Sequence, residues 1–375
     1  MKIEQLSLNP GQDWRTHHSS LHGTQPQVVL AFGGRRLLED AAYFKKLRAR
    51  YPDARIVASS TSGEITGTEI TEDALTVTAI ALEKTRVSCA ALPIRDARES
   101  HALGCELARM LSDEDLVHIF IVADGQLTNG TELARGLAEN LPNGVALSGG
   151  LAGDGDRFQK TVVGLDEPPA SGRIVAIGFY GKNFKSSCGS AGGWAPFGPE
   201  RIVTRAEGNR LYELDGRSAL ALYKQYLGEQ ARELPGSALR FPLCISPANG
   251  NPDVVRTILS IDESTQSMTF AGDIPSGARV HFMRASYEDL LDGAAEASQK
   301  ARAPGSELVV CVSCVGRRIV LGQRTEEETE IVREIMGPQA VLTGFYSYGE
   351  LAPASHGDIC QLHNQTMTVT AFSET

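Results

Sequence analysis

Short strand-like runs alternate with helical patterns along this sequence, and one order of elements occurs twice. In the first half we expect a helix over 99–111, a strand over 116–123, a helix over 131–140 and strands over 145–149, 159–165 and 173–180. In the second half the matching ranges are 287–301, 307–313, 326–336, 340–346, 359–363 and 367–372. The pattern predicts mixed α/β structure with largely antiparallel sheets.

The length of 375 residues is about twice that of a typical domain, which predicts two domains. We expect α/β domains over residues 27–183 and 184–375. Residues 1–26 are polar and aperiodic, so a flexible tail is expected there. A metal-binding tail is the alternative, because this segment holds three histidines, His17, His18 and His22.

Two segments at corresponding places in the two series begin alike. They are L-S-G-G-L-A-G-D at Leu147–Asp154 and L-T-G-F-Y-S-Y-G-E at Leu342–Glu350. The shared order and the shared segment predict a divergent internal duplication. Chance similarity is the alternative, because leucine, glycine and small hydroxyl residues are common.

Charge and composition exclude several classes of protein. The net charge of −10 argues against a nucleic-acid or anionic-membrane partner. The N-terminus lacks the apolar core of a signal peptide, and no apolar run is long enough for a membrane helix. We therefore expect a cytoplasmic protein, and its seven cysteines predict free thiols rather than a disulfide framework.

The glycine-rich segment from Ser148 to Gly155 allows two interpretations. Its glycines, Gly149 among them, permit positive φ angles and a close approach to the backbone, so Ser148, Gly149 and Asp154 are candidate ligand contacts. The segment matches neither nucleotide-binding glycine motif, and a strand rather than a helix is expected after it. A tight turn between strands is the alternative.

The matching segment of the second half is aromatic. Strand alternation places Tyr346 and Tyr348 on one face, where they would form one wall of a small-molecule pocket. Glu350 would then hold an amine or hydroxyl of the ligand. Core tyrosines with satisfied hydroxyls are the alternative.

Cys314 stands at the end of a predicted strand, beside Arg317 and Arg318. Positive neighbours favour the thiolate, and a Cys-His enzyme would use Cys314 with His363 and Glu350. A buried structural cysteine is the alternative. A zinc site is disfavoured, because the paired ligands of Cys311–Cys314 and Cys360–His363 would point to opposite faces of their strands.

The final strand-like run begins L-H-N-Q-T-M-T, in which His363 and Asn364 point to opposite faces. A histidine in such a run is more often a hydrogen-bonding residue than a ligand. The sequence has no C-x-x-C-H motif, so covalent c-type haem is excluded.

Several segments together resemble the FIST family, the F-box and intracellular signal-transduction proteins. They are L-S-G-G-L-A-G-D-G-D-R-F, L-D-G-R-S-A-L-A-L-Y-K-Q-Y-L-G, F-A-G-D-I-P-S-G, S-C-V-G-R, G-F-Y-S-Y-G-E-L-A-P and L-H-N-Q-T-M-T. The resemblance covers nearly everything after the N-terminal tail, in both the FIST N and the FIST C regions. It implies a non-catalytic sensory module that binds a small molecule such as an amino acid.

The resemblance also implies a partner. Bacterial FIST proteins are associated with histidine kinases of two-component systems or with diguanylate cyclases and phosphodiesterases, and the two regions account for this chain, so we expect a separate output protein. In the expected pocket Arg317 would bind a ligand carboxylate and Glu350 an amine. The full set of expected ligand-binding residues is Cys314, Arg317, Tyr346, Tyr348, Glu350, His363, Asn364, Ser148, Gly149 and Asp154.

Three alternatives to this interpretation remain open. Some members of the family are haem-binding nitric oxide sensors, and His363 would then be the first candidate for the axial ligand, ahead of His281 and His118. A hydrolase or transferase would use Cys314 as its nucleophile. A protein-interaction scaffold would have no pocket with convergent polar groups.

Overall fold

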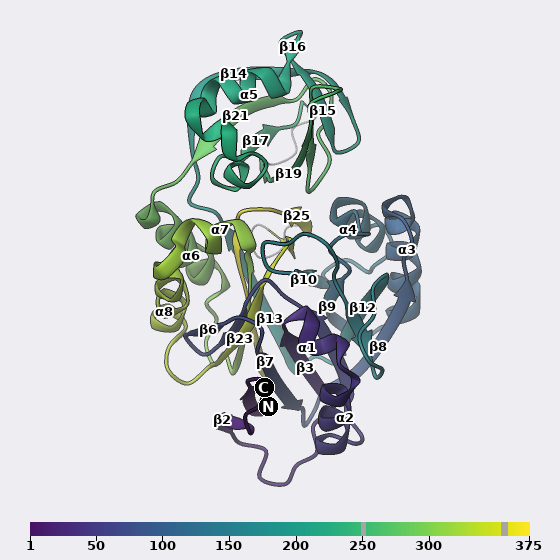
Figure 1. The fold of residues 1–375 in the computed structure, drawn as a ribbon. Coiled ribbons are helices and arrows are strands. Elements are labelled where there is room, and N and C mark those ends of the chain that lie inside the picture. Colours follow the sequence, from purple (N-terminus) through teal and green to yellow (C-terminus); the bar gives the residue numbers. More distant parts are fainter. Residues whose placement is uncertain (249–252, 354–358) are drawn as a thin grey trace.

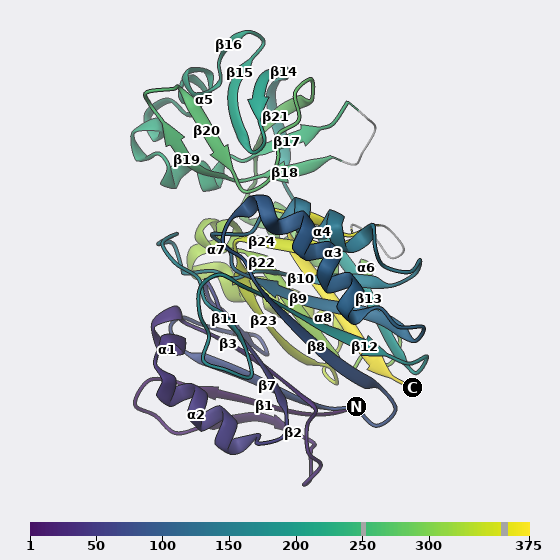
Figure 2. The same cartoon turned by 90° about the vertical axis from the view of Figure 1, so that its right-hand side faces the viewer.

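The computed structural model describes residues 1–248, 253–353 and 359–375. It has a core of three sheets and a smaller module, which lies above the core in Figures 1 and 2. The protein is therefore a mixed α/β structure whose sheets are largely antiparallel, as expected from the sequence.

The three core sheets have six strands each. In spatial order, the first sheet contains β11 (Val163–Leu165), β4 (Arg55–Ser60), β3 (Val28–Gly33), β7 (Leu75–Ala81), β1 (Lys2–Leu8) and β2 (Arg15–Ser19). The second contains β25 (Gln361–His363), β24 (Gly349–Ala352), β10 (Ala146–Leu151), β9 (Leu116–Ala123), β12 (Arg173–Tyr180) and β8 (Arg86–Pro93). The third contains β13 (Phe184–Ala191), β26 (Met367–Glu374), β22 (Leu308–Cys314), β23 (Val341–Ser347), β5 (Glu64–Thr66) and β6 (Glu69–Thr71).

One four-strand pattern recurs in all three sheets. In each, two parallel neighbours are followed by two antiparallel strands: β4-β3-β7-β1, β10-β9-β12-β8 and β23-β22-β26-β13. Each unit also sends an edge strand to another unit's sheet, since β5 pairs with β23, β24 with β10, and β11 with β4. The segments Leu147–Asp154 and Leu342–Glu350 do occupy equivalent places, but the repeat occurs three times, so the expected duplication is corrected to a threefold pattern.

The inner faces of the three sheets meet in one apolar core. Along β3, Leu30 and Phe32 point into this centre, while Val29 and Ala31 point outward against the helices, as the period of a strand requires. Central strands buried on both faces need nearly continuous apolar runs, which is why strands such as V-V-L-A-F-G have no polar alternation.

Helices cover the outer faces of the sheets. The helices of the core are α1 (Arg35–Glu39), α2 (Ala41–Arg50), α3 (Ser100–Leu111), α4 (Gly130–Ala138), α6 (Tyr287–Ala301), α7 (Val315–Leu321) and α8 (Thr325–Met336). The pair α3 and α4 packs on the second sheet, and α6 and α8 pack on the third. Ser286 and Asp289 form a capping box at the start of α6, which fixes that boundary at the residue expected from the sequence.

The N-terminal 26 residues do not form the expected flexible tail. β1 pairs along its whole length with β7, and Leu6 is fully buried. The N-terminal ammonium group lies 2.9 Å from Glu307 and 3.5 Å from Glu374, so both ends of the chain meet in the core (Figure 1). The prediction was wrong because the polar residues of β1 are not all exposed. Gln5 is buried, and its side chain donates a hydrogen bond to the Leu342 carbonyl.

The expected division at residue 183 does not follow the sheets either. β5 and β6 belong to the third sheet, and β24 and β25 belong to the second, so the two halves exchange strands. The module is instead inserted between β13 and α6. Its elements are β14 (Ala195–Glu207), β15 (Arg210–Leu214), β16 (Arg217–Ser218), α5 (Ala219–Leu227), β17 (Leu243–Ser246), β18 (Val254–Arg256), β19 (Ile258–Asp262), β20 (Ser267–Phe270) and β21 (Arg279–Arg284).

The module has an apolar core of its own, built around Tyr223, Phe270 and Phe282. Two connections join it to the rest of the chain, one on either side of residues 195–284. Among the described residues, no helix combines the length and the apolar character that a membrane crossing requires.

Candidate functional site

Three adjoining cavities form a cleft in the region where the core faces the module. Their volumes are about 270, 350 and 490 Å³. The first and third share Asp156, Arg157 and Ile319, and the second and third share Phe158 and Leu259. We call these three cavities together the cleft.

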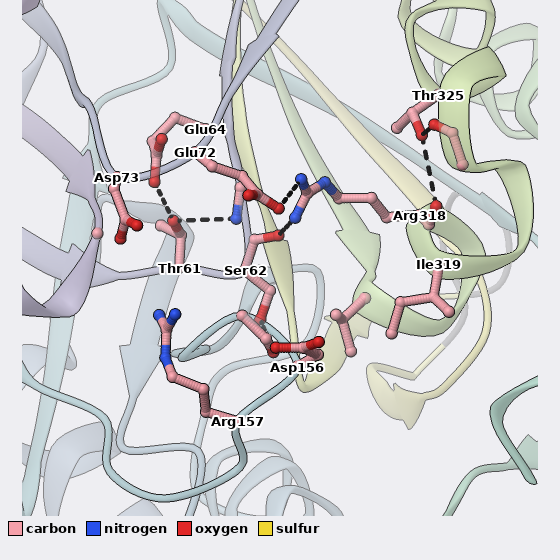
Figure 3. Close-up of a pocket in the computed structure, with 15 residues that line it drawn as sticks. Thr61, Ser62, Glu64, Glu72, Asp73, Asp156, Arg157, Arg318, Ile319 and Thr325 are labelled. Carbon is pink, nitrogen blue, oxygen red and sulfur yellow. Dashed lines mark hydrogen bonds and ion pairs between the residues drawn. The ribbon is translucent and has the colours of Figure 1, made fainter. Parts of the chain in front are cut away.

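The first cavity lies where strands of different units end. Its walls come from the turn after β4, the turn after β10 and helix α7, which directly follows β22 (Figure 3). β4, β10 and β22 each have a parallel neighbour, and the carboxyl ends of parallel strands are the usual place for a ligand site in α/β proteins. The recurring pattern therefore assembles this cavity from all three units.

Two arginines reach into the first cavity from opposite sides (Figure 3). Arg318 pairs with Glu72 and donates a hydrogen bond of 2.5 Å to the Ser62 carbonyl. Arg157 donates from Nε to Asp154 Oδ1 at 2.9 Å. The two Nη groups of Arg157 donate no hydrogen bond to any described residue, so they are available to a ligand.

Carboxylates also line this cavity. Asp73 is exposed and forms neither a hydrogen bond nor an ion pair through its side chain with the described residues. Glu64 is buried, and burial raises the pKa of its carboxyl group to about 8 although Thr61, Thr71 and the Ala74 amide donate to it. At neutral pH Glu64 is therefore largely uncharged. Asp73 and Asp156, which is likewise exposed and has no side-chain partner among the described residues, offer free carboxylates to this cavity.

Tyr348 is the predicted residue that lines the cleft directly. Its ring stacks on Phe158 with the centroids 4.5 Å apart, and both rings line the second cavity. The Tyr348 hydroxyl donates to the Gly155 carbonyl at 3.2 Å and accepts from the Phe158 amide at 3.1 Å. It thereby fixes the turn that carries Arg157.

Asp154 lies directly beneath the cleft. It is fully buried and accepts hydrogen bonds from Arg35 at 3.0 Å and from Arg157 at 2.9 Å. Its Oδ2 atom has no hydrogen-bond partner among the described residues. Asp154 therefore orients Arg157 instead of lining the cavity itself.

Tyr346 and Arg317 do not share a wall with Tyr348. Tyr346 is fully buried, and its hydroxyl donates to Glu328 at 2.9 Å. The guanidinium of Arg317 is also fully buried, 2.5 Å from Glu328, and it donates to the Leu290 carbonyl at 2.6 Å. Strand β23 ends at Ser347, so the alternation of side chains expected for a strand stops before Tyr348. The two tyrosines therefore do not share one face.

Cys314, Glu350 and Asn364 lie in the interior behind α7. Burial raises the pKa of the Cys314 thiol well above its usual value, which is opposite to the expected activation by its arginine neighbours. Burial also raises the pKa of Glu350 to about 8, and this carboxyl accepts hydrogen bonds from Ser347 and Thr366. Cys314 is therefore a neutral core thiol at neutral pH.

The histidines do not meet the needs of a haem site. His363 Nε2 lies 3.0 Å from the Ala352 carbonyl, and burial lowers the pKa of its imidazole to about 4. His118 lies between Ser148 and Ser186, at 2.9 and 3.0 Å. No histidine lines the cleft among the described residues, so these side chains do not fit an axial ligand there.

The surroundings of Ser148 and Gly149 indicate structural roles. Ser148 is fully buried beside His118. Gly149 has φ of 144°, and a Cβ atom there would lie 1.9 Å from the Ile121 carbonyl oxygen. Glycine is required at this position because β9 approaches closely. This agrees with the interpretation of the segment as a structural turn between strands.

One possible metal cluster lies outside the cleft. Within the described ranges, ligand atoms of His101, Cys105 and Glu139 lie within 4.8 Å of one another. His101 Nε2 already contacts Glu139 at 2.8 Å. The cysteines considered for zinc, Cys311 and Cys314, are buried on β22 and form no such cluster within the same ranges.

The sequence patterns did not single out Arg157 and Asp73, nor the place of Arg318 on the wall of the first cavity. Arg157 stands in the run G-D-G-D-R-F, directly after the glycine-rich segment. A charged residue inside a glycine-rich turn was a usable signal there. Asp73 gave none, because it reaches the cavity only through the hairpin between β6 and β7.

Comparison with known proteins gives two family matches. The FIST N domain matches residues 27–217, and the FIST C domain matches residues 219–353. An uncharacterized protein of Methanocaldococcus jannaschii is 23% identical over 366 residues, covering 86% of this chain and 68% of that protein. Uncharacterized proteins of Mycobacterium tuberculosis and Mycobacterium bovis are 25% and 26% identical over 254 and 241 residues, covering 64% and 61% of this chain.

The chain spans 64% and 61% of the length of those two mycobacterial relatives. The descriptions of all three relatives assign no activity.

Proposed function

This chain belongs to the FIST family, whose domains are generally sensory domains of signal transduction, and on that premise we propose that it senses a small amino-acid-like ligand in the cleft. The signal then passes to a separate partner, such as a histidine kinase or a cyclic-dinucleotide enzyme. We propose no catalytic step. The buried, neutral thiol of Cys314 supports this, because a cysteine nucleophile requires an accessible thiolate.

The observation that carries the proposal is that free charges of opposite sign line the first cavity, the cation Arg157 and the carboxylates of Asp73 and Asp156. Arg157 offers two unengaged Nη groups, which match a carboxylate in bidentate geometry. Asp73 offers a carboxylate without a partner among the described residues, which suits an ammonium group. A zwitterion satisfies both, whereas a simple anion or cation leaves one of them unpaired.

The second and third cavities extend this site beyond the two charges. Phe158 and Leu259, which line both, supply apolar surface beside Arg157. An amino acid with its backbone groups in the first cavity would direct its side chain along this surface. The proposal therefore includes a preference for amino acids with apolar or aromatic side chains.

The position of the cleft supports a way to transmit the signal. Asn129 of the core donates to Asp273 of the module at 3.1 Å, and Gln365 of the core donates to the Leu239 carbonyl at 3.1 Å. A ligand that contacts both the core and the module favours the relative position of the two in which it makes more contacts. It thereby changes the surface that the protein offers to the partner.

Calorimetric titration with the twenty L-amino acids tests the proposal. We expect binding of at least one amino acid with an apolar or aromatic side chain, and loss of binding when its carboxylate is replaced by an amide or its amine is acetylated. Arg157→Gln should weaken binding by about tenfold or more, because the bidentate pair is lost. Asp73→Asn should weaken binding by a similar factor.

Arg98→Gln is the matched control, because Arg98 is exposed and pairs with Asp96 outside the cleft. It should leave the affinity unchanged. Equal affinities for the amino acid and its amide, or an unchanged affinity in Arg157→Gln, would contradict the proposal.

A further inference from the structure

A separate cavity of about 430 Å³ lies where α4 and β25 of the core approach β17 and β18 of the module. It shares no lining residue with the cleft. Most of its wall is apolar and comes from both bodies, with Ala138 and Leu362 from the core and Ile245 and Val254 from the module. This volume and lining are typical of a small-molecule site.

Arg256 is the feature of this cavity that needs an explanation. It ends β18 and is 4% exposed. Its Nε atom has no hydrogen-bond partner, and it forms no ion pair with any described residue. To the described residues it makes one short hydrogen bond, from Nη1 to the Leu362 carbonyl at 2.9 Å, while the contacts to Thr131 Oγ1 and the Val255 carbonyl are 3.5 Å long.

Burial of a guanidinium that has so few close partners costs free energy. An arginine has five N–H donors, and in Arg256 the Nε donor has no partner among the described residues while two of the three contacts made by the Nη groups are long. Weakly satisfied donors away from water cost free energy that a carboxylate partner would offset. Burial lowers the pKa of Arg256 to about 10, which shows the same penalty on its charged form.

The other charged groups of the cavity do not supply that partner. Asp273 is close enough to favour the charge of Arg256, yet it lies beyond ion-pair distance and accepts a hydrogen bond from Asn129 at 3.1 Å. Arg135 is paired with Glu132, and it lies 3.8 Å from Glu139. Arg256 is thus the cation of this cavity that lacks a close carboxylate among the described residues.

We propose that this cavity is a second ligand site, which binds a small carboxylate with an unbranched apolar tail, the class of medium-chain aliphatic acids. The carboxylate pairs with the guanidinium of Arg256, and the tail lies against Ile245, Val254 and Leu362. The proposal does not depend on the amino-acid site, because the two sites share no lining residue. Since Arg256 belongs to the module and contacts Leu362 of the core, an acid bound here would also act on the junction between the two bodies.

The test is calorimetric titration of the full chain with octanoate, with 1-octanol and octylamine as probes of equal tail length. We expect octanoate to bind about tenfold more tightly than 1-octanol or more, because the alcohol cannot pair with Arg256. Octylamine should bind more weakly than 1-octanol, since its ammonium group is repelled. Equal binding of the three probes, or no binding of octanoate, would overturn the proposal.

Two variants separate the two parts of the site. Arg256→Gln should reduce octanoate affinity to the level of 1-octanol, while the affinity for 1-octanol changes by less than about twofold. Ala138→Trp should exclude both probes, because Ala138 is half-buried on the cavity wall and the indole fills the space. Retained preference for octanoate in Arg256→Gln would also overturn the proposal.

Arg279→Gln is the matched control, because Arg279 is an exposed arginine on β21 of the same module and does not line the cavity. It should bind octanoate as the unchanged protein does. If Arg256→Gln does not fold, the preference of the unchanged protein for acid over alcohol, together with Ala138→Trp, still decides the matter.

Discussion

Arg317 and Glu328 form a fully buried ion pair behind the cleft. Two more groups donate to Glu328, the hydroxyls of Ser313 and Tyr346, both at 2.9 Å. Arg317 also donates to the carbonyls of Gly192 and Leu290, next to the connection that leads into the module and at α6. The pair therefore ties the third sheet to α6 and α8, which is a structural role.

Replacing Arg317 with alanine should lower the free energy of unfolding by about 3–5 kcal/mol, because Glu328 would be left charged and buried without its partner. Chemical denaturation in urea measures the change. Arg324→Ala is the control, since Arg324 is a partly exposed arginine paired with Glu288 and Glu327, and it should cost about 1 kcal/mol or less. An Arg317→Ala protein as stable as the control would show that Arg317 is free for another role.

Three acidic residues, each directly after a glycine, stand shortly past the ends of β4, β10 and β23, namely Glu64, Asp154 and Glu350. All three are buried, yet their partners differ. Asp154 is held by two arginines, whereas hydroxyl and amide groups surround Glu64 and Glu350. Burial is the largest cause of the raised pKa of Glu64 and of Glu350, so these two carboxyls are largely uncharged at neutral pH.

At the level of elements, two pairs of parallel strands approach each other so closely that each requires a glycine. Gly149 on β10 and Gly344 on β23 face Ile121 and Cys311 in the neighbouring strands. A Cβ atom would lie 1.9 Å and 1.8 Å from the carbonyl oxygens of those residues. In the first unit Ala58 stands at this outward-facing position, opposite Ala31, so the close approach is specific to two of the three units.

Gly149→Ala and Gly344→Ala should each lower the free energy of unfolding by roughly 3 kcal/mol or more, because backbone must move to admit the methyl group. Gly236→Ala is the control: Gly236 has no atom within 4 Å of an added Cβ and an ordinary φ angle, so a change within about 0.5 kcal/mol is expected. Thermal and urea unfolding followed by circular dichroism measure these differences. Small effects at Gly149 and Gly344 would mean that the two strands separate readily.

Elements with strong local signals were predicted closely. Helix α6 runs over Tyr287–Ala301 as expected, because its capping box and its apolar period act within the element itself. Helix α7 was missed, since Val315–Leu321 is short and follows β22 without a turn. β1 was missed because its burial comes from distant partners, among them Leu342.

At the level of the whole molecule, the cleft lies where two independently packed bodies meet. The module has its own apolar core, and direct hydrogen bonds such as Asn129 to Asp273 join it to the rest. Contacts of this polar kind permit relative motion of the bodies. The segment of residues 228–241, which lines the third cavity, belongs to the module and faces Arg157 and Phe158 of the core.

Hydrogen exchange can test whether a ligand couples the two bodies. With the tightest-binding amino acid present, we expect slower exchange in residues 228–241 and in residues 155–158, because both line the cleft. Exchange in β7, which lies in the first sheet, should not change. Protection limited to residues 155–158 would place the ligand in the core alone and remove the module from the signalling step.

The amino-acid sequence was sufficient to predict the mixed α/β class, most helices and central strands, the family and the equivalence of Leu147–Asp154 with Leu342–Glu350. These follow from periodicity and motifs, which are local properties of the chain. The three-dimensional structure was needed to show that the unit occurs three times, that edge strands are exchanged, and that Arg157 is available where Arg317 is not. Strand pairing and charge pairing join residues far apart in the chain, so no local pattern states which partner a buried group will find.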